Sequence, residues 1–220
     1  MRKEFKIILN PFFHSLFLAW CIVGGILLLL FSKEQLFAVV NTHYTVYGDV
    51  VMYYTTWLGQ PEVIAPTLLL LMISLPSLRT KWFFFTAIVC NVIPLFIQQL
   101  LKRIFHHPRP LNYFDWAGHK ADWIHYLPTW PELLRNSFPS GHSQGAFSFF
   151  CLLTFLLPKK YKHIGIVFFF AALSVCYSRL YLAAHFFADI YTGSIIGGVS
   201  TTLIYSVMVW LKHNKQLPIE

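Results

Sequence analysis

The sequence predicts an all-α fold, a bundle of six transmembrane helices in a polytopic membrane protein. Of the 220 residues, 56% are hydrophobic and only 12% are charged, whereas a soluble domain normally carries about 25% charged residues. The apolar residues are grouped in six stretches that polar segments separate. Because lipid offers no hydrogen-bond partner to backbone amides, each stretch is expected to be helical.

The six predicted spans follow one another without a repeat or a linker, so residues 1–220 are predicted to form a single domain. Their ranges are Phe12–Phe31, Val63–Leu78, Trp82–Leu101, Ser143–Leu157, Ile164–Leu182 and Ile190–Leu211. The second and fourth are short, so they are expected to begin inside their flanking loops or to lie where the membrane is thin. We interpret the first as a retained span, because no cleavage pattern of a signal peptide follows it.

Basic residues in the short loops predict the orientation of the chain. They precede the first span, separate the second from the third and the fourth from the fifth, and follow the last: Arg2, Lys3, Lys6, Arg79, Lys81, Lys159, Lys160, Lys162, Lys212 and Lys215. Both termini are therefore predicted to be cytoplasmic, in the inner (cytoplasmic) membrane of the cell. The net charge of +8 is accounted for by this pattern, and nucleic acid is not expected as a partner.

Three segments are predicted to face outward, to the periplasmic or extracellular side: Ser32–Glu62, Lys102–Gly141 and Ala183–Asp189. The first of them is rich in aromatic residues: Tyr44, Tyr47, Tyr53, Tyr54 and Trp57. Such a composition is typical of a segment that lies at the level of the lipid headgroups. Basic residues that oppose the charge rule lie in the second segment and just before the third, as expected of cations held near a membrane for function: Lys102, Arg103, Arg109, Lys120, Arg135 and Arg179.

Three clusters on this outer side carry the residue types that handle phosphate. Lys102, Arg109 and Arg179 supply three cations, and the two guanidinium groups are planar forks that suit phosphate oxygens. Ser140 and Gly141 precede the fourth span, where a hydroxyl and backbone amides could meet an anion at a helix N-terminus. The alternatives are that Lys102 only reaches toward the interface and that the segment around Ser140 is an ordinary helix cap.

Two histidines complete the set. If Ala184–Tyr191 is helical, His185 and Asp189 lie one turn apart on one face, and the carboxylate could fix the tautomer of the ring. A histidine held in this way could attack phosphorus, and His142 could then protonate the leaving alkoxide. Alternatively, Asp189 could pair with Arg179 and neutralise it.

These clusters resemble the motifs of the type 2 phosphatidic acid phosphatase (PAP2) superfamily, K-x6-R-P, P-S-G-H and S-R-x5-H-x3-D. The matching residues are Lys102, Arg109 and Pro110, then Pro139, Ser140, Gly141 and His142, then Ser178, Arg179, His185 and Asp189. The motif-bearing segment covers residues 102–189, and the plan of six spans extends the resemblance over nearly the whole chain. The resemblance implies a six-helix membrane bundle with its pocket at the outer leaflet.

The resemblance also implies a lipid phosphatase that needs neither a metal nor another cofactor. In it His185 would be the nucleophile that forms a phosphohistidine, Asp189 would orient that ring, and His142 would be the general acid and then the base. The residues implied to bind the phosphoryl oxygens are Lys102, Arg109, Ser140, Gly141 and Arg179.

Three other functions stay open. A phosphotransferase would pass the phosphoryl group to a lipid hydroxyl instead of water. A metal-dependent hydrolase would use the histidines of the outer loop, His106, His107, His119 and His125, although their spacing matches no familiar ligand set. A transporter or scramblase of the same fold would have been free to lose its catalytic histidines.

The predicted partners are the lipid bilayer and a membrane lipid phosphate, and no obligatory protein partner is expected. Candidate substrates are undecaprenyl diphosphate, phosphatidylglycerophosphate, lipid A phosphate and phosphatidic acid. The motifs recognise the phosphate and therefore do not choose among these lipids. The compact size and modest loops suggest a bacterial protein, by analogy alone.

Overall fold

The computed structural model describes residues 4–116, 123–127 and 135–214. Within these ranges every regular element is a helix. Some residues named in these predictions lie outside the described ranges: the basic residues Arg2, Lys3, Lys120 and Lys215, and His119.

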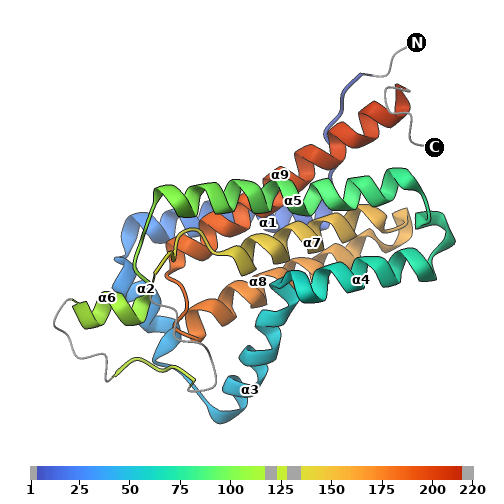
Figure 1. The fold of residues 1–220 in the computed structure, drawn as a ribbon. Coiled ribbons are helices and arrows are strands. Elements are labelled where there is room, and N and C mark those ends of the chain that lie inside the picture. The colour runs from blue at the N-terminus through green and yellow to red at the C-terminus, as the bar shows by residue number, and fades with distance from the viewer. Residues whose placement is uncertain (1–3, 117–122, 128–134, 215–220) are drawn as a thin grey trace.

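Six helices form the body of the bundle and run along its length (Figure 1). They are α1 (Pro11–Leu30), α4 (Pro61–Ser74), α5 (Lys81–Ile104), α7 (Gly141–Leu156), α8 (Gly165–Tyr181) and α9 (Phe187–His213). A helix thus lies over each of the six predicted apolar stretches. Short 3-10 helices join two pairs of them, η2 (Pro76–Leu78) between α4 and α5 and η4 (Lys159–Ile164) between α7 and α8.

The described residues contain four helical segments that are long and apolar enough to cross a membrane: Pro11–Leu30, Lys81–Ile104, Lys159–Tyr181 and Phe187–His213. A fifth span results if Val46–Gly59 and Pro61–Ser74, which meet at 62°, are taken as one bent span. The chain is therefore a multi-pass membrane protein, and the count of six spans stays a prediction. A helix rises about 1.5 Å per residue. With 16 residues, α7 is therefore shorter than the thickness of the hydrocarbon core, which is about 30 Å.

The central helix is α7, which packs most extensively against α9 and α8. Its Phe147 is fully buried, with ring centroids 6.3 Å from Phe13 on α1 and 6.0 Å from Phe169 on α8. The start of α7 approaches α9 closely, because a Cβ on Gly193 would lie 2.4 Å from the carbonyl oxygen of Ser140. This contact fixes the beginnings of α7 and α9, and with them two of the three motifs, against each other.

The four remaining helices that the structure describes gather at one end of the bundle, whereas residues 4–10 and the end of α9 lie at the other end (Figure 1). They are α2 (Lys33–Asn41), α3 (Val46–Thr55), η1 (Thr56–Gly59) and α6 (Pro110–Trp116). The side of α3 that faces away from the protein is apolar and aromatic, with Val46, Tyr47, Val50, Val51 and Tyr54 all exposed. An outward apolar face of this kind suits a helix that lies at the membrane interface.

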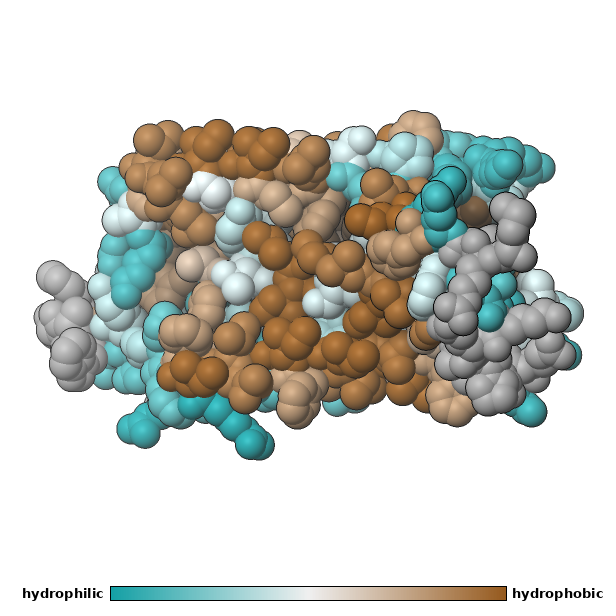
Figure 2. All heavy atoms as spheres, turned by 90° about the horizontal axis from the view of Figure 1, so that it is seen from above, coloured by the Kyte–Doolittle hydropathy of each residue, from teal (hydrophilic) through white to brown (hydrophobic). Residues whose placement is uncertain are grey.

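The surface of the protein is divided into an apolar middle and two hydrophilic ends (Figure 2). Apolar residues cover the middle of the face shown, and hydrophilic residues collect at its two ends. Exposed large side chains on α1, α4 and α5, such as Leu29, Leu70 and Phe96, are 87%, 62% and 68% exposed. Because a soluble protein rarely exposes so extended an apolar surface, this surface indicates that lipid surrounds the bundle.

Candidate active site

The three motif-bearing segments converge at the end of the bundle that carries α2, α3 and α6. The charges of Lys102 near the end of α5, Arg109 after it and Arg179 at the end of α8 all act on both His142 and His185. The topology of the predicted spans placed these segments on one side, and the structure brings them into one cluster.

The predicted pairing of His185 with Asp189 is present, although the helix assumed for it is not. The expected helix over Ala184–Tyr191 is wrong at its start, because α9 begins at Phe187. Asp189 occupies the third position of α9, where its carboxylate accepts a hydrogen bond of 2.9 Å from the backbone N–H of Phe186. The same oxygen, Oδ2, lies 3.4 Å from Nδ1 of His185. Of the two predicted roles of Asp189, the structure thus shows the one beside His185.

Ser137 is a member of this group that the sequence analysis missed. Its hydroxyl donates a hydrogen bond to Oδ2 of Asp189, and its Oγ lies 3.3 Å from Nδ1 of His185. The backbone N–H of Ser137 is bonded to the carbonyl of His107 at 3.0 Å. Ser137 thus links the segment before α7 to both members of the histidine–carboxylate pair, and all three side chains are buried.

The electrostatic environment of His185 favours a neutral ring. His185 is 1% exposed, and burial lowers the pKa of its imidazole well below the ordinary value. The nearby charges of Arg109, Arg179 and Lys102 lower this pKa further. Nη1 of Arg109 lies 3.4 Å from Nε2 of His185, so a ring whose Nδ1 proton faces Asp189 presents the lone pair of Nε2 to the cations.

The three predicted cations are held by the protein in different ways. Arg109 donates hydrogen bonds of 2.9 Å to the carbonyls of Arg135 and Ala184, and burial lowers its pKa to about 10, so the side chain is still charged at neutral pH. Arg179 is fully buried and donates to the hydroxyl of Thr56 at 2.8 Å. Lys102 is half-buried near the end of α5.

Positive charges outnumber negative charges in this cluster. Among the described residues, Asp189 is the only carboxylate whose charge acts on Lys102 or Arg109. Collecting positive charges in a poorly solvated site is costly unless anions compensate for them. The arrangement of three cations around a neutral histidine therefore suits a bound anion with several oxygens, such as a phosphoryl group.

Ser140 and Gly141 form the start of α7 beside this cluster. Oγ of Ser140 accepts hydrogen bonds from the backbone N–H and the hydroxyl of Ser143, at 3.3 and 3.0 Å, so the helix-cap interpretation is correct for this oxygen. A Cβ on Gly141 would come no closer than 3.5 Å to the side chain of Gln98. An added Cβ would thus be in ordinary van der Waals contact with Gln98. Gly141 is the first residue of α7, and a helix N-terminus favours anions.

Two other residues near the site carried no sequence signal. Nε2 of His142 lies 3.1 Å from the side-chain nitrogen of Gln60, between η1 and α4. Gln98 on α5 donates to the carbonyl of Pro139 at 2.9 Å, and its own Oε1 has no hydrogen-bond partner among the described residues. A single glutamine in an apolar helix or a turn is too common a pattern to be identified from sequence.

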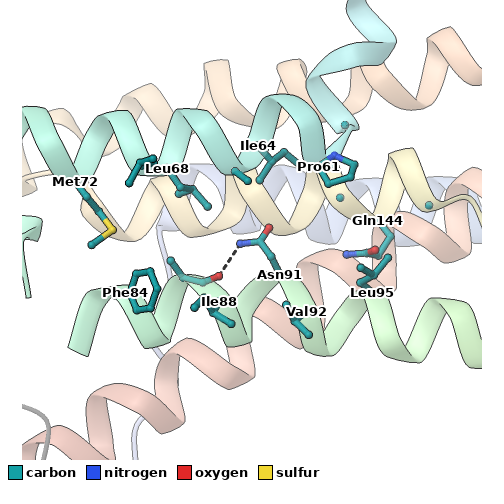
Figure 3. Close-up of a pocket in the computed structure, with 16 residues that line it drawn as sticks. Pro61, Ile64, Leu68, Met72, Phe84, Ile88, Asn91, Val92, Leu95 and Gln144 are labelled. Carbon is teal, nitrogen blue, oxygen red and sulfur yellow. Dashed lines mark hydrogen bonds between the residues drawn. The ribbon is translucent and has the colours of Figure 1, made fainter. Parts of the chain in front are cut away.

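An apolar groove begins beside the cluster and runs between α4, α5 and α7 (Figure 3). Its volume is about 330 Å³. Pro61 and Gln144 line one end, and Met72 and Phe84 line the other. Gly59 and Gly141 are also among the lining residues. The walls are almost entirely apolar, and the side chain of Asn91 within the groove is bonded to the carbonyl of Ala87 at 2.9 Å.

Of the four histidines of the alternative metal site, the structure describes His106, His107 and His125. Nδ1 of His106 is 3.4 Å from Asn136, whereas His125 forms a contact of 2.6 Å with Asp49 and stacks on Tyr44. Within the described ranges, no group of three or more histidine, cysteine, aspartate or glutamate residues is arranged to hold a metal ion.

A multi-pass helical membrane protein with a cluster of cations and histidines at one end of its bundle is the class of protein that this fold and site define. The chain belongs to the PAP2 superfamily, whose model matches residues 80–213. This match covers more than half of the chain and includes every motif residue described above.

Proteins similar in sequence are lipid phosphatases. An undecaprenyl-diphosphatase of Sulfolobus acidocaldarius is 26% identical over 200 residues, which cover 90% of this chain and 88% of the relative. Dolichyldiphosphatase 1 of Dictyostelium discoideum is 35% identical over 106 residues, 43% of this chain and 46% of the relative. A lipid A 1-phosphatase of Rhizobium etli is 27% identical over 136 residues, 59% of this chain and 53% of the relative. The chain is accordingly a phosphatase.

Two solved structures share the fold. LpxE of Aquifex aeolicus superposes with a TM-score of 0.62 at 25% identity, over 80% of this chain and 96% of that protein. A transmembrane PAP2-type phosphatidylglycerolphosphate phosphatase of Bacillus subtilis superposes with a TM-score of 0.57 at 21% identity, over 90% and 96% of the two chains. The helical bundle is thus that of membrane PAP2 proteins.

Proposed function

We propose that this protein hydrolyses a phosphate monoester or diphosphate of a membrane lipid through a phosphohistidine formed on His185. The observation that carries the proposal is the position of a buried, neutral His185 beside Lys102, Arg109 and Arg179. A neutral imidazole is the nucleophilic form of histidine, and three cations offset the charge of the phosphoryl oxygens as the transition state develops.

In the proposed reaction, Nε2 of His185 attacks phosphorus while the bond from phosphorus to the lipid oxygen breaks. His142, which takes up a proton when the negatively charged phosphoryl group is bound, donates that proton to the leaving oxygen. Lys102, Arg109, Arg179 and the start of α7, Ser140–Gly141, bind the non-bridging oxygens. In the second half, His142 takes a proton from water, whose oxygen attacks phosphorus and displaces His185. Inorganic phosphate leaves, and both histidines return to their first protonation states.

Asp189 supports the charge that develops on His185. Attack through Nε2 leaves the ring positively charged, with its proton on Nδ1, and Oδ2 of Asp189 lies 3.4 Å from that nitrogen. The carboxylate therefore stabilises the intermediate more than the neutral resting ring. None of these steps requires a metal or another cofactor.

The groove between α4, α5 and α7 supports a lipid as the substrate. Gly59 and Gly141 are among its lining residues, beside the proposed phosphate-binding cluster, and its walls are almost entirely apolar. A chain of CH₂ groups gains about 0.8 kcal/mol for each group buried, so such a groove favours a lipid tail attached to the phosphate. The similarity to undecaprenyl- and dolichyl-diphosphatases and to a lipid A 1-phosphatase supports the same class of substrate.

We place the active site at the outer face of the cell membrane, in a single domain with six spans and both termini in the cytoplasm. The lysine and arginine residues of the short loops support this orientation. The exposed apolar and aromatic face of α3 supports a position of this end of the bundle at the lipid headgroups.

Phosphate release by the purified protein tests the proposal. The protein in detergent with excess chelator should release inorganic phosphate from at least one of undecaprenyl diphosphate, phosphatidylglycerophosphate, lipid A phosphate and phosphatidic acid. His185→Ala should abolish the release. Activity that a divalent ion restores after chelation would favour the metal-dependent reaction, and a strict requirement for an acceptor lipid would favour the phosphotransferase.

A further inference from the structure

The bend between α3 and α4 packs directly on the first turn of α7. It consists of η1 and Gln60 and joins two helices that meet at 62° (Figure 1). A Cβ on Gly59 would lie 2.4 Å from the carbonyl oxygen of His142, and a Cβ on Gly145 would lie 2.6 Å from the carbonyl oxygen of Gly59. Because only glycine permits such an approach of two backbones, the bend is held at a fixed distance from His142.

Two side chains of this bend reach the phosphate-binding cluster. The side-chain nitrogen of Gln60 lies 3.1 Å from Nε2 of His142. The hydroxyl of Thr56 accepts a hydrogen bond of 2.8 Å from Nη1 of Arg179, and both of these residues are fully buried. Neither Gln60 nor Thr56 belongs to one of the three motifs, yet each contacts a residue that does.

A carboxamide is well matched to a histidine that alternates between two protonation states. It carries both a donor and an acceptor, and a half-turn about its terminal torsion exchanges them. Gln60 can therefore accept a hydrogen bond from a ring N–H or donate one to a bare ring nitrogen. It does so without a charge, whereas the carboxylate beside His185 favours the positively charged ring.

We propose that Gln60 is a positioning residue for proton transfer by His142, and that Thr56 is a positioning residue for phosphoryl binding by Arg179. This inference rests on the proposed function, because it assigns the two residues to steps of that reaction. Gln60 holds the imidazole in the orientation that reaches the leaving oxygen. Thr56 holds the guanidinium group at the non-bridging oxygens.

The two contacts predict different kinetic signatures. Protonation of the leaving group matters for an alkyl lipid phosphate and hardly at all for para-nitrophenyl phosphate, because nitrophenolate leaves without a proton. Gln60→Leu should lower kcat/KM about tenfold for the lipid phosphate that the wild type cleaves fastest, the loss expected for one hydrogen bond. For para-nitrophenyl phosphate its kcat/KM should fall less than about threefold, because the step that depends on this hydrogen bond is not limiting.

Two substitutions sharpen this test. Gln60→Glu keeps an acceptor for the imidazole but loses the donor and adds a negative charge, so it should recover only part of the lipid phosphatase activity. Thr56→Val should lower kcat/KM by a similar factor for both substrates, because both present the same phosphoryl oxygens to Arg179. Thr67→Val is the matched control, since its hydroxyl lies on α4 and donates to the carbonyl of Val63 one turn earlier in the same helix, and it should change neither rate.

Thermal unfolding in detergent shows whether each variant is folded. Equal losses on both substrates by a Gln60→Leu protein with unchanged Tm, or no loss on either, would contradict the positioning role while the wild type remains active. Absence of phosphate release by the wild type would instead contradict the proposed function. The two failures are therefore distinguishable.

Discussion

Oδ2 of Asp189 lies 3.4 Å from Nδ1 of His185, although the helix that carries Asp189 begins two residues after the histidine. The carboxylate has a second contact in the same place, because it also caps the start of α9 through the N–H of Phe186. The position of the carboxylate is therefore determined by the helix end, and the histidine is held next to it by the turn from α8.

Ser137 provides the first prediction, because its hydroxyl contacts both His185 and Asp189. Ser137→Ala removes a hydrogen bond to a charged group, which is worth roughly 1.5–3 kcal/mol, so kcat/KM should fall about ten- to hundredfold. Asp189→Asn should cost more, up to about 10⁴-fold by analogy with other histidine–aspartate pairs. Steady-state kinetics on one lipid phosphate measures both, and a Ser137→Ala enzyme as active as the wild type would show that this hydroxyl does not support the pair.

The pH profile tests the electrostatic account of His185. Burial and the nearby cations lower the pKa of the ring below its ordinary value of about 6.5, and the neutral ring is the reactive form. The acid limb of kcat/KM, which reports the free enzyme, should therefore lie below pH 6.5. Arg109→Gln removes the cation nearest Nε2, which lets this pKa rise, so the limb should move to higher pH while the maximum rate falls.

Arg103→Gln is the control for that shift. Arg103 is an exposed residue one position after Lys102, and its charge is not among those that act on His185. Its substitution should leave the acid limb in place. A limb at or above pH 6.5 in the wild type, or a shift to lower pH in Arg109→Gln, would contradict the assignment.

Gly193 tests whether the contact between α7 and α9 holds the site together. In Gly193→Ala the added Cβ would meet the carbonyl oxygen of Ser140 at 2.4 Å, and a backbone atom cannot rotate away. Overpacking of this kind typically costs about 1–3 kcal/mol, so both Tm and activity should fall. In Gly25→Ala the nearest atom is the hydroxyl of Tyr191 at 3.3 Å, and a much smaller effect is expected. Equal stability of the two variants would show that α7 and α9 can separate without loss.

The orientation of the chain can be tested by labelling intact cells. His43 lies in the turn between α2 and α3 and Lys159 lies in η4, and both are exposed. A cysteine at position 43 should react with a membrane-impermeant thiol reagent, whereas one at position 159 should react only after lysis. The wild-type protein serves as the background, and the reverse labelling would place the active site in the cytoplasm.

The sequence predicted the clustering of the motifs because each motif lies at the end of an apolar stretch. Alternation of loops across the membrane then sends Lys102, His142 and Arg179 to the same side. The partners of these residues could not be predicted in this way. Ser137 meets Asp189 across 52 positions, Gln60 meets His142 across 82, and Thr56 meets Arg179 across 123.

The first outer segment, Ser32–Glu62, also shows how far the sequence could predict the structure. Its aromatic composition predicted a location at the headgroups, and α3 indeed exposes Tyr47 and Tyr54. Composition carried no information on the bend at η1, because that bend is determined by the close approach of Gly59 to the first turn of α7. Tertiary contacts of this type leave no periodic pattern in the residues that form them.

Trapping of the covalent intermediate tests the central claim most directly. Wild-type protein mixed with a cleaved lipid phosphate and quenched at alkaline pH, where phosphohistidine persists, is digested and the peptides are analysed by mass spectrometry. We predict a phosphoryl group on the peptide that contains His185, present in His142→Ala and absent in His185→Ala. Phosphate release without any phosphorylated peptide, or with the phosphoryl group on His142 instead, would contradict the assignment of His185 as the nucleophile.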